Sequence, residues 1–243
     1  MIHPKEKDDA VSPVIALMLI LAILATCMAV YTTTYVPGLK QQDEITHSGE
    51  VKFAFMRFAS DIDNTIAQGK PAVYTEVLEL GGGDVPLSPS KSSGTVEINT
   101  TEIGKYQING GEEQVLNGIE ISYVPSFTAW EKQGYLYKNG VVWITKDEKI
   151  TPASMTLYKI ENGTDRENET IAKWYPDTAV VIPQFSVDEN RSEITGTSTA
   201  KLRLNATLGD TETNSVTVKL NDGSSKIYAA NTVRFLNIEV SVE

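Results

Sequence analysis

Residues that could support catalysis or bind a metal are scarce in this chain of 243 residues. The chain has two histidines, His3 and His47, and one cysteine, Cys27. A Ser-His-Asp triad needs a histidine beside a serine in space, and a lone cysteine forms neither an internal disulfide nor a cysteine-based zinc site. We therefore predict no catalytic residue, no metal site and no cofactor. We expect His47 to be a polar side chain on the outer face of a helix.

Carboxylates are plentiful, so catalysis by carboxylates or Ca²⁺ binding stays open as an alternative. None of the close groups follows the spacing of a calcium-binding loop, and solvated surface charge is the favoured interpretation. The tryptophans could line a sugar site, although we expect at least two of them to pack in the core. The residues concerned are Asp61, Asp63, Glu112, Glu113, Asp147 and Glu148, with Trp130, Trp143 and Trp174.

Five Asn-x-Ser/Thr sequons could accept N-linked sugar, and all of them follow the apolar N-terminal segment. This placement suits an exported domain whose loops carry sugar, while a polar strand and loop composition is the alternative explanation. The candidate glycosylation sites are Asn99, Asn162, Asn168, Asn190 and Asn205.

The formal net charge of −11, with 32 acidic against 21 basic residues, argues against a nucleic-acid partner. Binding to phosphates requires a basic face, which this composition does not favour. An acidic surface instead keeps a protein soluble.

The N-terminal segment predicts a helix that crosses a membrane. Residues 10–30 carry no charge and are almost wholly apolar, and at about 1.5 Å per residue they match a hydrocarbon core of about 30 Å. A secretory signal would have a shorter apolar stretch, of roughly 7–15 residues. Tyr31 and Tyr35 then follow, as aromatic residues do at membrane interfaces. We predict a single transmembrane helix over residues 11–36, with membrane lipid as its partner.

The charges that flank the span predict its orientation. Lys5 and Lys7 precede the apolar run, and the acidic residues beside them count little in the positive-inside rule. The N-terminus is therefore expected in the cytoplasm and the remainder of the chain outside the cell.

The start of the span reads AVSPVI from Ala10, after an acidic pair and before a run of Leu, Ile, Ala and Met. This stretch resembles the N-terminus of archaeal type IV pilins and pilin-like proteins. The resemblance implies a class III signal peptide, in which residues 1–10 are a leader ending in Asp9 and Ala10. A prepilin peptidase would cut there and leave Val11 as the first mature residue. Ser12 can serve as N-cap and Pro13 as the first helical residue.

The stretch after the span, residues 31–50, reads YTTTYVPGLKQQDEITHSGE and includes a valine-proline junction and the pair His47-Ser48. It resembles a group of uncharacterised archaeal pilin-like membrane proteins. This resemblance implies a location and an architecture, but no activity.

Residues 37–69 predict an amphipathic stalk helix, which Gly69-Lys70-Pro71 ends. Pro37-Gly38 should kink or interrupt the helix. One apolar stripe contains Val51, Phe55, Phe58, Ile62 and Ile66, and a second contains Ile45, Gly49, Phe53 and Met56. This wide apolar face favours packing on the chain's own sheet, with a seam between subunits as the alternative.

Residues 70–243 predict an extracellular domain of many short strands. Asn139-Gly140 between two β-rich runs is a strong hairpin signal, and the glycine-rich stretch 81–93 is expected to be a loop because it lacks the P-loop pattern. The expected class is α+β, with a mostly antiparallel, sandwich-like β domain. The predicted strands are 72–80, 95–99, 116–124, 134–138, 141–145, 155–160, 178–187, 200–208, 215–220 and 233–242.

These expectations describe a noncatalytic, membrane-anchored, pilin-like protein of the cell surface, acting as a filament subunit or an adhesin. Its partners would be the prepilin peptidase and other pilin-like subunits. The first alternative is an unprocessed anchored module that binds surface glycan or an envelope protein. An anchored hydrolase that uses carboxylates is the least favoured alternative.

Overall fold

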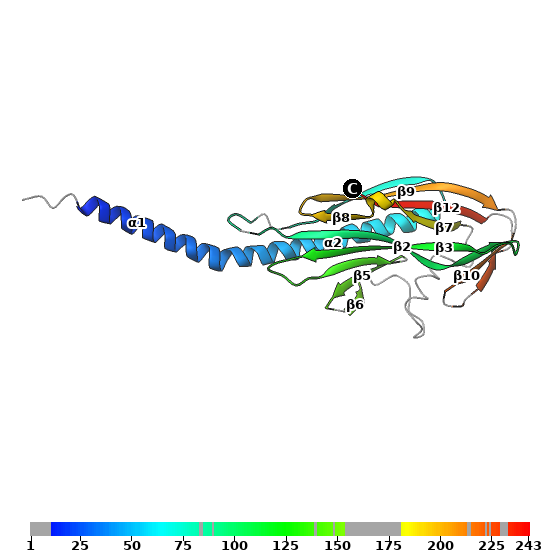
Figure 1. The fold of residues 1–243 in the computed structure, drawn as a ribbon, viewed down its shortest axis with the longest axis horizontal. Helices are drawn as coiled ribbons and strands as arrows, with labels where there is room; N and C mark the ends of the chain where they lie inside the picture. Colours follow the sequence, from blue (N-terminus) through cyan, green and yellow to red (C-terminus); the bar gives the residue numbers. More distant parts are fainter. Residues whose placement is uncertain are drawn as a thin grey trace, which may run out of the picture.

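The structure is a computed structural model that describes residues 11–243, except 83–84, 89, 139, 148, 154–180, 213–214, 222, 224 and 229–232. One helical segment runs from Val11 to Gln68 and leads into a β domain (Figure 1). Its parts are α1 (Val11–Val30), a π-helical turn (Tyr31–Tyr35) and α2 (Val36–Gln68). Gly69 ends α2 in a left-handed conformation (φ 58°), where its N–H donates to the carbonyl of Thr65, as the Gly-Lys-Pro signal predicts.

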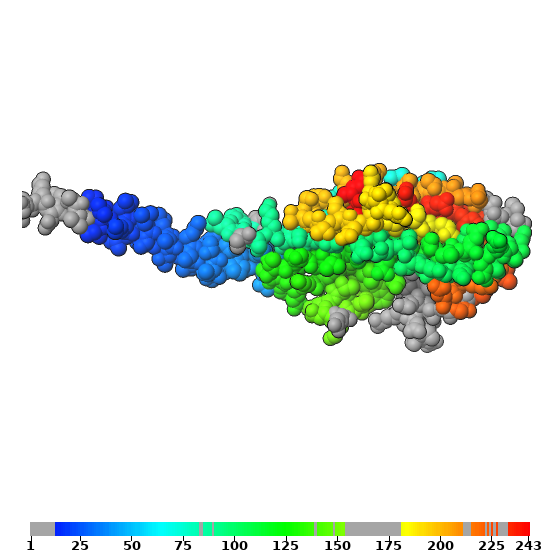
Figure 2. All heavy atoms as spheres, viewed as in Figure 1, coloured from blue at the N-terminus to red at the C-terminus, as the bar shows by residue number. Residues whose placement is uncertain are grey.

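The helix α1 projects from one end of the β domain and is not covered by it (Figure 2). Every residue from Pro13 to Val30 is exposed, although the segment is apolar throughout. The helix is long and apolar enough to cross a membrane. Both properties agree with the predicted anchor.

The prediction that Pro37-Gly38 would kink or interrupt the helix is correct only in its first half. The chain stays helical through both residues, and its direction changes where α1 gives way to α2 (Figure 1). Pro37 lacks an N–H and its ring crowds the carbonyl four residues earlier. The π turn directly before it relieves this conflict, because the N–H of Val36 donates to the carbonyl of Tyr31, five residues back.

Two β-sheets form the domain. The smaller sheet has the strand order β1-β9-β12-β7, and the larger sheet has the order β11-β10-β2-β3-β4-β5-β6, with β8 also paired to β2. The pairing is antiparallel except between β7 and β12. The strands are β1 (Ala72–Glu79), β2 (Ser93–Ile108), β3 (Gln114–Ser126), β4 (Gly134–Lys138), β5 (Val141–Lys146), β6 (Lys149–Pro152), β7 (Val181–Val187), β8 (Glu193–Gly196), β9 (Thr199–Glu212), β10 (Val216–Leu220), β11 (Ser225–Tyr228) and β12 (Val233–Val242).

The α+β class and the mostly antiparallel domain are therefore confirmed. The β4–β5 hairpin is present, with Gly140 at φ 90° in its turn, while Asn139 lies outside the described residues. The predicted strand 155–160 also lies outside them. Three short strands that the sequence did not predict, β6, β8 and β11, complete the larger sheet.

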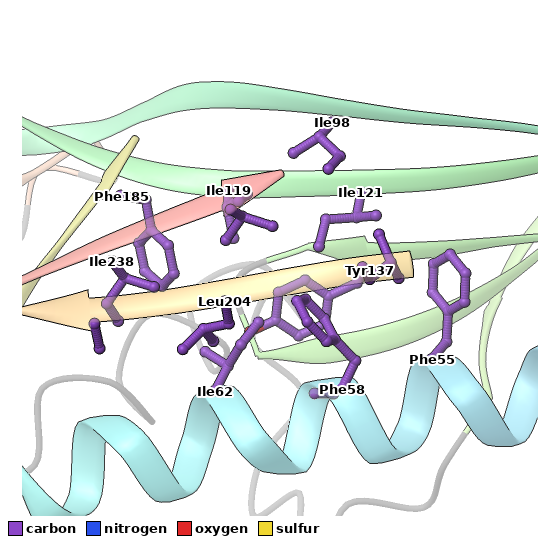
Figure 3. Close-up of a cluster of buried hydrophobic side chains, with 14 of the residues drawn as sticks. Phe55, Phe58, Ile62, Ile98, Ile119, Ile121, Tyr137, Phe185, Leu204 and Ile238 are labelled. Carbon is purple, nitrogen blue, oxygen red and sulfur yellow. The ribbon is translucent and has the colours of Figure 1, made fainter. Parts of the chain in front are cut away.

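The helix α2 packs inside the domain, as its apolar stripe predicts. It contacts β1, β7 and β9 of the smaller sheet and β4 and β5 of the larger one. Phe55, Phe58 and Ile62 point from α2 into a core shared with β2, β3, β9 and β12 (Figure 3). The second predicted stripe packs only in part, because Met56 is half-buried against this core whereas Ile45 and Phe53 are exposed.

Candidate functional site

The buried face of α2 is polar at the end nearest α1. Lys40, Glu44, His47 and Ser48 follow one another at helical spacing, and each is at most 5% exposed. The same face continues as the apolar stripe that starts at Val51. We call these four polar residues the polar neck, because they lie where the helix enters the domain.

Glu44 is a fully buried carboxylate that connects the helix to two loops. Its Oε1 accepts hydrogen bonds from Ser92 Oγ (2.5 Å) and the backbone N–H of Thr128 (2.9 Å), and its Oε2 accepts one from the N–H of Ala129 (2.8 Å). Burial alone would raise the pKa of Glu44, but these hydrogen bonds more than offset it and hold the pKa below its ordinary value. Glu44 is therefore ionised and fully partnered in the fold.

Lys40 and Ser48 extend these connections. Lys40 Nζ donates to the carbonyl oxygen (2.6 Å) and the Oγ (2.7 Å) of Ser90, in the loop that precedes β2. Ser48 Oγ lies 2.9 Å from the hydroxyl of Tyr135 in β4. The polar neck thus holds α2 to segments of the chain that are far from it in sequence.

A hydrogen bond fixes the orientation of the His47 ring and leaves the second ring nitrogen without a partner among the described residues. Its Nε2 lies 2.9 Å from the hydroxyl of Tyr123, and that hydroxyl donates to the carbonyl of Leu80 (3.2 Å). Because the tyrosine proton is already used, His47 Nε2 must be the donor, which assigns the lone pair of the neutral ring to Nδ1. The Nδ1 atom is buried and has no hydrogen-bond partner among the described residues.

This placement contradicts the expectation that His47 is a polar surface residue, since it is only 3% exposed. Its ring packs edge-on against Phe127 and bonds to Tyr123, two residues brought in by the β3 strand and the loop after it. Burial lowers the pKa of His47, and attraction to Glu50, Glu79 and other nearby carboxylates opposes this shift without reversing it.

A pocket of about 370 Å³ lies beside His47 and carries three carboxylates, those of Asp43, Glu50 and Glu79. A ring nitrogen of His47 and one carboxylate oxygen from each of Glu50 and Glu79 all lie within 4.8 Å of one another. The pocket is otherwise lined by hydroxyl side chains, by Lys91 and by the backbone at the start of the loop after β1. Among the described residues, His47, Glu50 and Glu79 form the group that could hold a metal ion.

Gly82 explains how the loop approaches this cluster so closely. A Cβ atom at position 82 would lie 2.8 Å from His47 Cβ and 3.0 Å from Asp43 Oδ2. The described residues of the stretch before β2 form a loop, as predicted, although Ser93 already belongs to β2. The missing side chain of Gly82 lets the backbone pass over the histidine.

The sequence did not predict this cluster. His47 and Glu50 are three residues apart on α2, a spacing that places them on one helix face, but Glu79 reaches them only through the β1 strand. Of the carboxylates considered from sequence, Asp61 and Asp63 are half-buried farther along α2, and Glu112, Glu113 and Asp147 are exposed. Glu148 lies outside the described residues.

Asn99, Asn190 and Asn205 are exposed, whereas Asn162 and Asn168 lie outside the described residues. Trp130 and Trp143 are half-buried instead of packed in the core, and Trp174 lies outside the described residues.

Around the predicted cleavage site, α1 begins at Val11 and contains Ser12 and Pro13 in its first turn, while Asp9 and Ala10 lie outside the described residues. Comparison of the chain with known protein families, with curated proteins and with solved structures finds no match.

Proposed function

We propose that the chain is a noncatalytic, pilin-like protein that is anchored in the cell membrane and holds its β domain outside the cell. One observation carries the proposal: a continuous helix is fully exposed and apolar over Pro13–Val30 and then becomes the core helix of the β domain. Such a helix can insert in lipid or pack against neighbouring copies without burying a charge.

The chemistry of the polar neck supports the noncatalytic part of this proposal. His47 Nε2 bonds to a tyrosine whose pKa burial raises well above its ordinary value. Ser92 donates its hydroxyl proton to the ionised Glu44 instead of to a histidine. Within the described residues, no serine or threonine hydroxyl forms a hydrogen bond with His47, so the arrangement favours structure over nucleophilic catalysis.

Processing is tested by mass spectrometry of the protein purified from its native membrane. We expect a mature chain that begins at Val11, as the pilin resemblance implies, and replacing Ala10 with a bulky residue should block the cut. An intact Met1 in the wild-type protein would contradict the processing claim and leave an unprocessed anchored module as the better description.

Assembly and orientation need separate measurements. Protease added to intact cells should digest the β domain if it lies outside the cell. Filaments sheared from cells should contain the chain. The chain in these filaments should carry sugar at the exposed Asn99, Asn190 and Asn205. A protease-resistant domain would contradict the orientation. Absence of the chain from sheared material would favour the anchored binding module over the filament subunit.

A further inference from the structure

We propose that His47, Glu50 and Glu79 form a binding site for one divalent transition-metal ion, with Zn²⁺ as the ion it takes. The proposal rests on two independent observations. The ligand atoms gather within 4.8 Å of one another, and the buried Nδ1 of His47 has no protein partner in the described structure.

The histidine is prepared for this role by its surroundings. A metal-binding histidine donates its other ring N–H to a fixed acceptor, which sets the tautomer and the ring orientation. Tyr123 provides that acceptor, and its own proton goes to the carbonyl of Leu80. Nδ1 is therefore the nitrogen that carries a free lone pair.

The carboxylates can complete the site with small movements. Tetrahedral Zn²⁺ with ligands at about 2.1 Å places the ligand atoms about 3.4 Å apart. Glu50 and Glu79 are exposed at the pocket wall, so rotation of their side chains can close the remaining distance. A water molecule would occupy the fourth position, as it does in zinc sites with three protein ligands.

The donor set and charge define the class of ion. Imidazole nitrogen suits Zn²⁺ and its transition-metal neighbours, whereas Ca²⁺ takes about 6–8 oxygen ligands. Three carboxylates against one lysine ammonium line the pocket, which leaves negative charge for a divalent cation to neutralise. Bound metal would join α2 to the end of β1 and act as a structural clamp where the helix enters the domain.

The test uses the full chain in detergent micelles, without a polyhistidine tag and after removal of metal by a chelator. His3→Ala and Cys27→Ser form the background, because both side chains could bind metal elsewhere. We expect calorimetry to give one Zn²⁺ per chain, Co²⁺ to produce the absorption bands of a low-symmetry site, and Zn²⁺ to raise the melting temperature.

Glu50 and Glu79 are exposed, so variants of these two ligands test metal binding without disturbing the folded core. Glu50→Gln and Glu79→Gln should each weaken Zn²⁺ binding at least about tenfold, and the double variant should lose the rise in melting temperature. Glu112→Gln, an exposed carboxylate far along the chain, is the matched control and should bind as the background does.

Three results would overturn the proposal. The first is no Zn²⁺ binding by the folded background protein, which would leave His47 Nδ1 to ordered water. The second is unchanged affinity in the Glu50→Gln/Glu79→Gln double variant. The third is Ca²⁺ binding that exceeds Zn²⁺ binding, which would reject the class of ion. None of these results bears on the membrane anchor or the cleavage at Val11.

Discussion

At the scale of single residues, the polar neck is stable because each buried charge has hydrogen-bond partners on segments that fold against the helix. Glu44 accepts two backbone N–H bonds from the loop that follows β3 and a hydroxyl bond from Ser92. An unpartnered carboxylate in this position would carry a large desolvation cost. These hydrogen bonds connect the two loops to the helix.

Replacing Glu44 with Gln should destabilise the fold by about 1–3 kcal/mol, because the neutral amide turns an NH₂ group toward N–H donors and weakens charge-assisted bonds. Urea unfolding followed by circular dichroism measures the change. Glu112→Gln, on the surface, should stay within about 0.5 kcal/mol of wild type. Equal stability of the two variants would contradict the role given to Glu44.

The same residue predicts a dependence on acid. Since the folded-state pKa of Glu44 lies below its ordinary value of 4.5, the stability it contributes is complete above pH 4.5 and is lost as the pH falls through the folded-state pKa. The unfolding free energy of wild type should therefore fall more steeply below pH 4.5 than that of Glu44→Gln. Parallel pH profiles for the two proteins would show that Glu44 is not the responsible group.

Of the polar neck, the sequence pointed only to the pair His47-Ser48, and it predicted neither the burial of His47 nor the hydrogen-bond partners of the four residues. His47 bonds to Tyr123, which is 76 positions away on β3, so only the folded chain brings the two side chains together. A histidine between polar residues gives the signature of a solvated face. The available clue was the spacing of Lys40, Glu44 and His47, which continues directly into the apolar stripe.

At the scale of elements, two of the three phenylalanines in α2 have opposite surroundings. Phe58 is 1% exposed in the core, whereas Phe53 is 60% exposed on the same helix. Phe58→Ala should cost about 3–5 kcal/mol through lost burial and the cavity it leaves, and Phe53→Ala should cost less than about 1 kcal/mol. Thermal unfolding distinguishes them, and similar losses for both would contradict the packing described.

Long elements were predictable and short ones were not. The apolar stripe of α2 and the alternation in β1, β3 and β12 each extend over enough residues to fix the type of element. The strands β6, β8 and β11 have four residues each and lie toward the margins of the larger sheet. Such segments become strands because a neighbouring strand offers hydrogen bonds, which is information that no local pattern contains.

At the scale of the whole molecule, the proposed attachment to the membrane rests on α1, the part of the described chain that is long and apolar enough to cross one. Arginine at the centre of a membrane helix costs about 2.5–3.5 kcal/mol, so Leu21→Arg with Leu24→Arg should release much of the protein on alkaline carbonate extraction. Val77→Arg places the same charge on an exposed apolar position of β1 and should leave the protein in the membrane. Retention of the double variant would contradict α1 as the anchor.

The π turn sets a further property of the molecule. A π turn contains one residue more than the α turn it replaces, and one residue rotates everything beyond it by about 100° around the helix axis. The residues Tyr31–Tyr35 therefore fix the rotation of the β domain about the helix axis relative to the faces of α1. Deletion of one residue in this turn would rotate the β domain about the helix axis relative to α1. The sequences of α1 and of the β domain would stay the same.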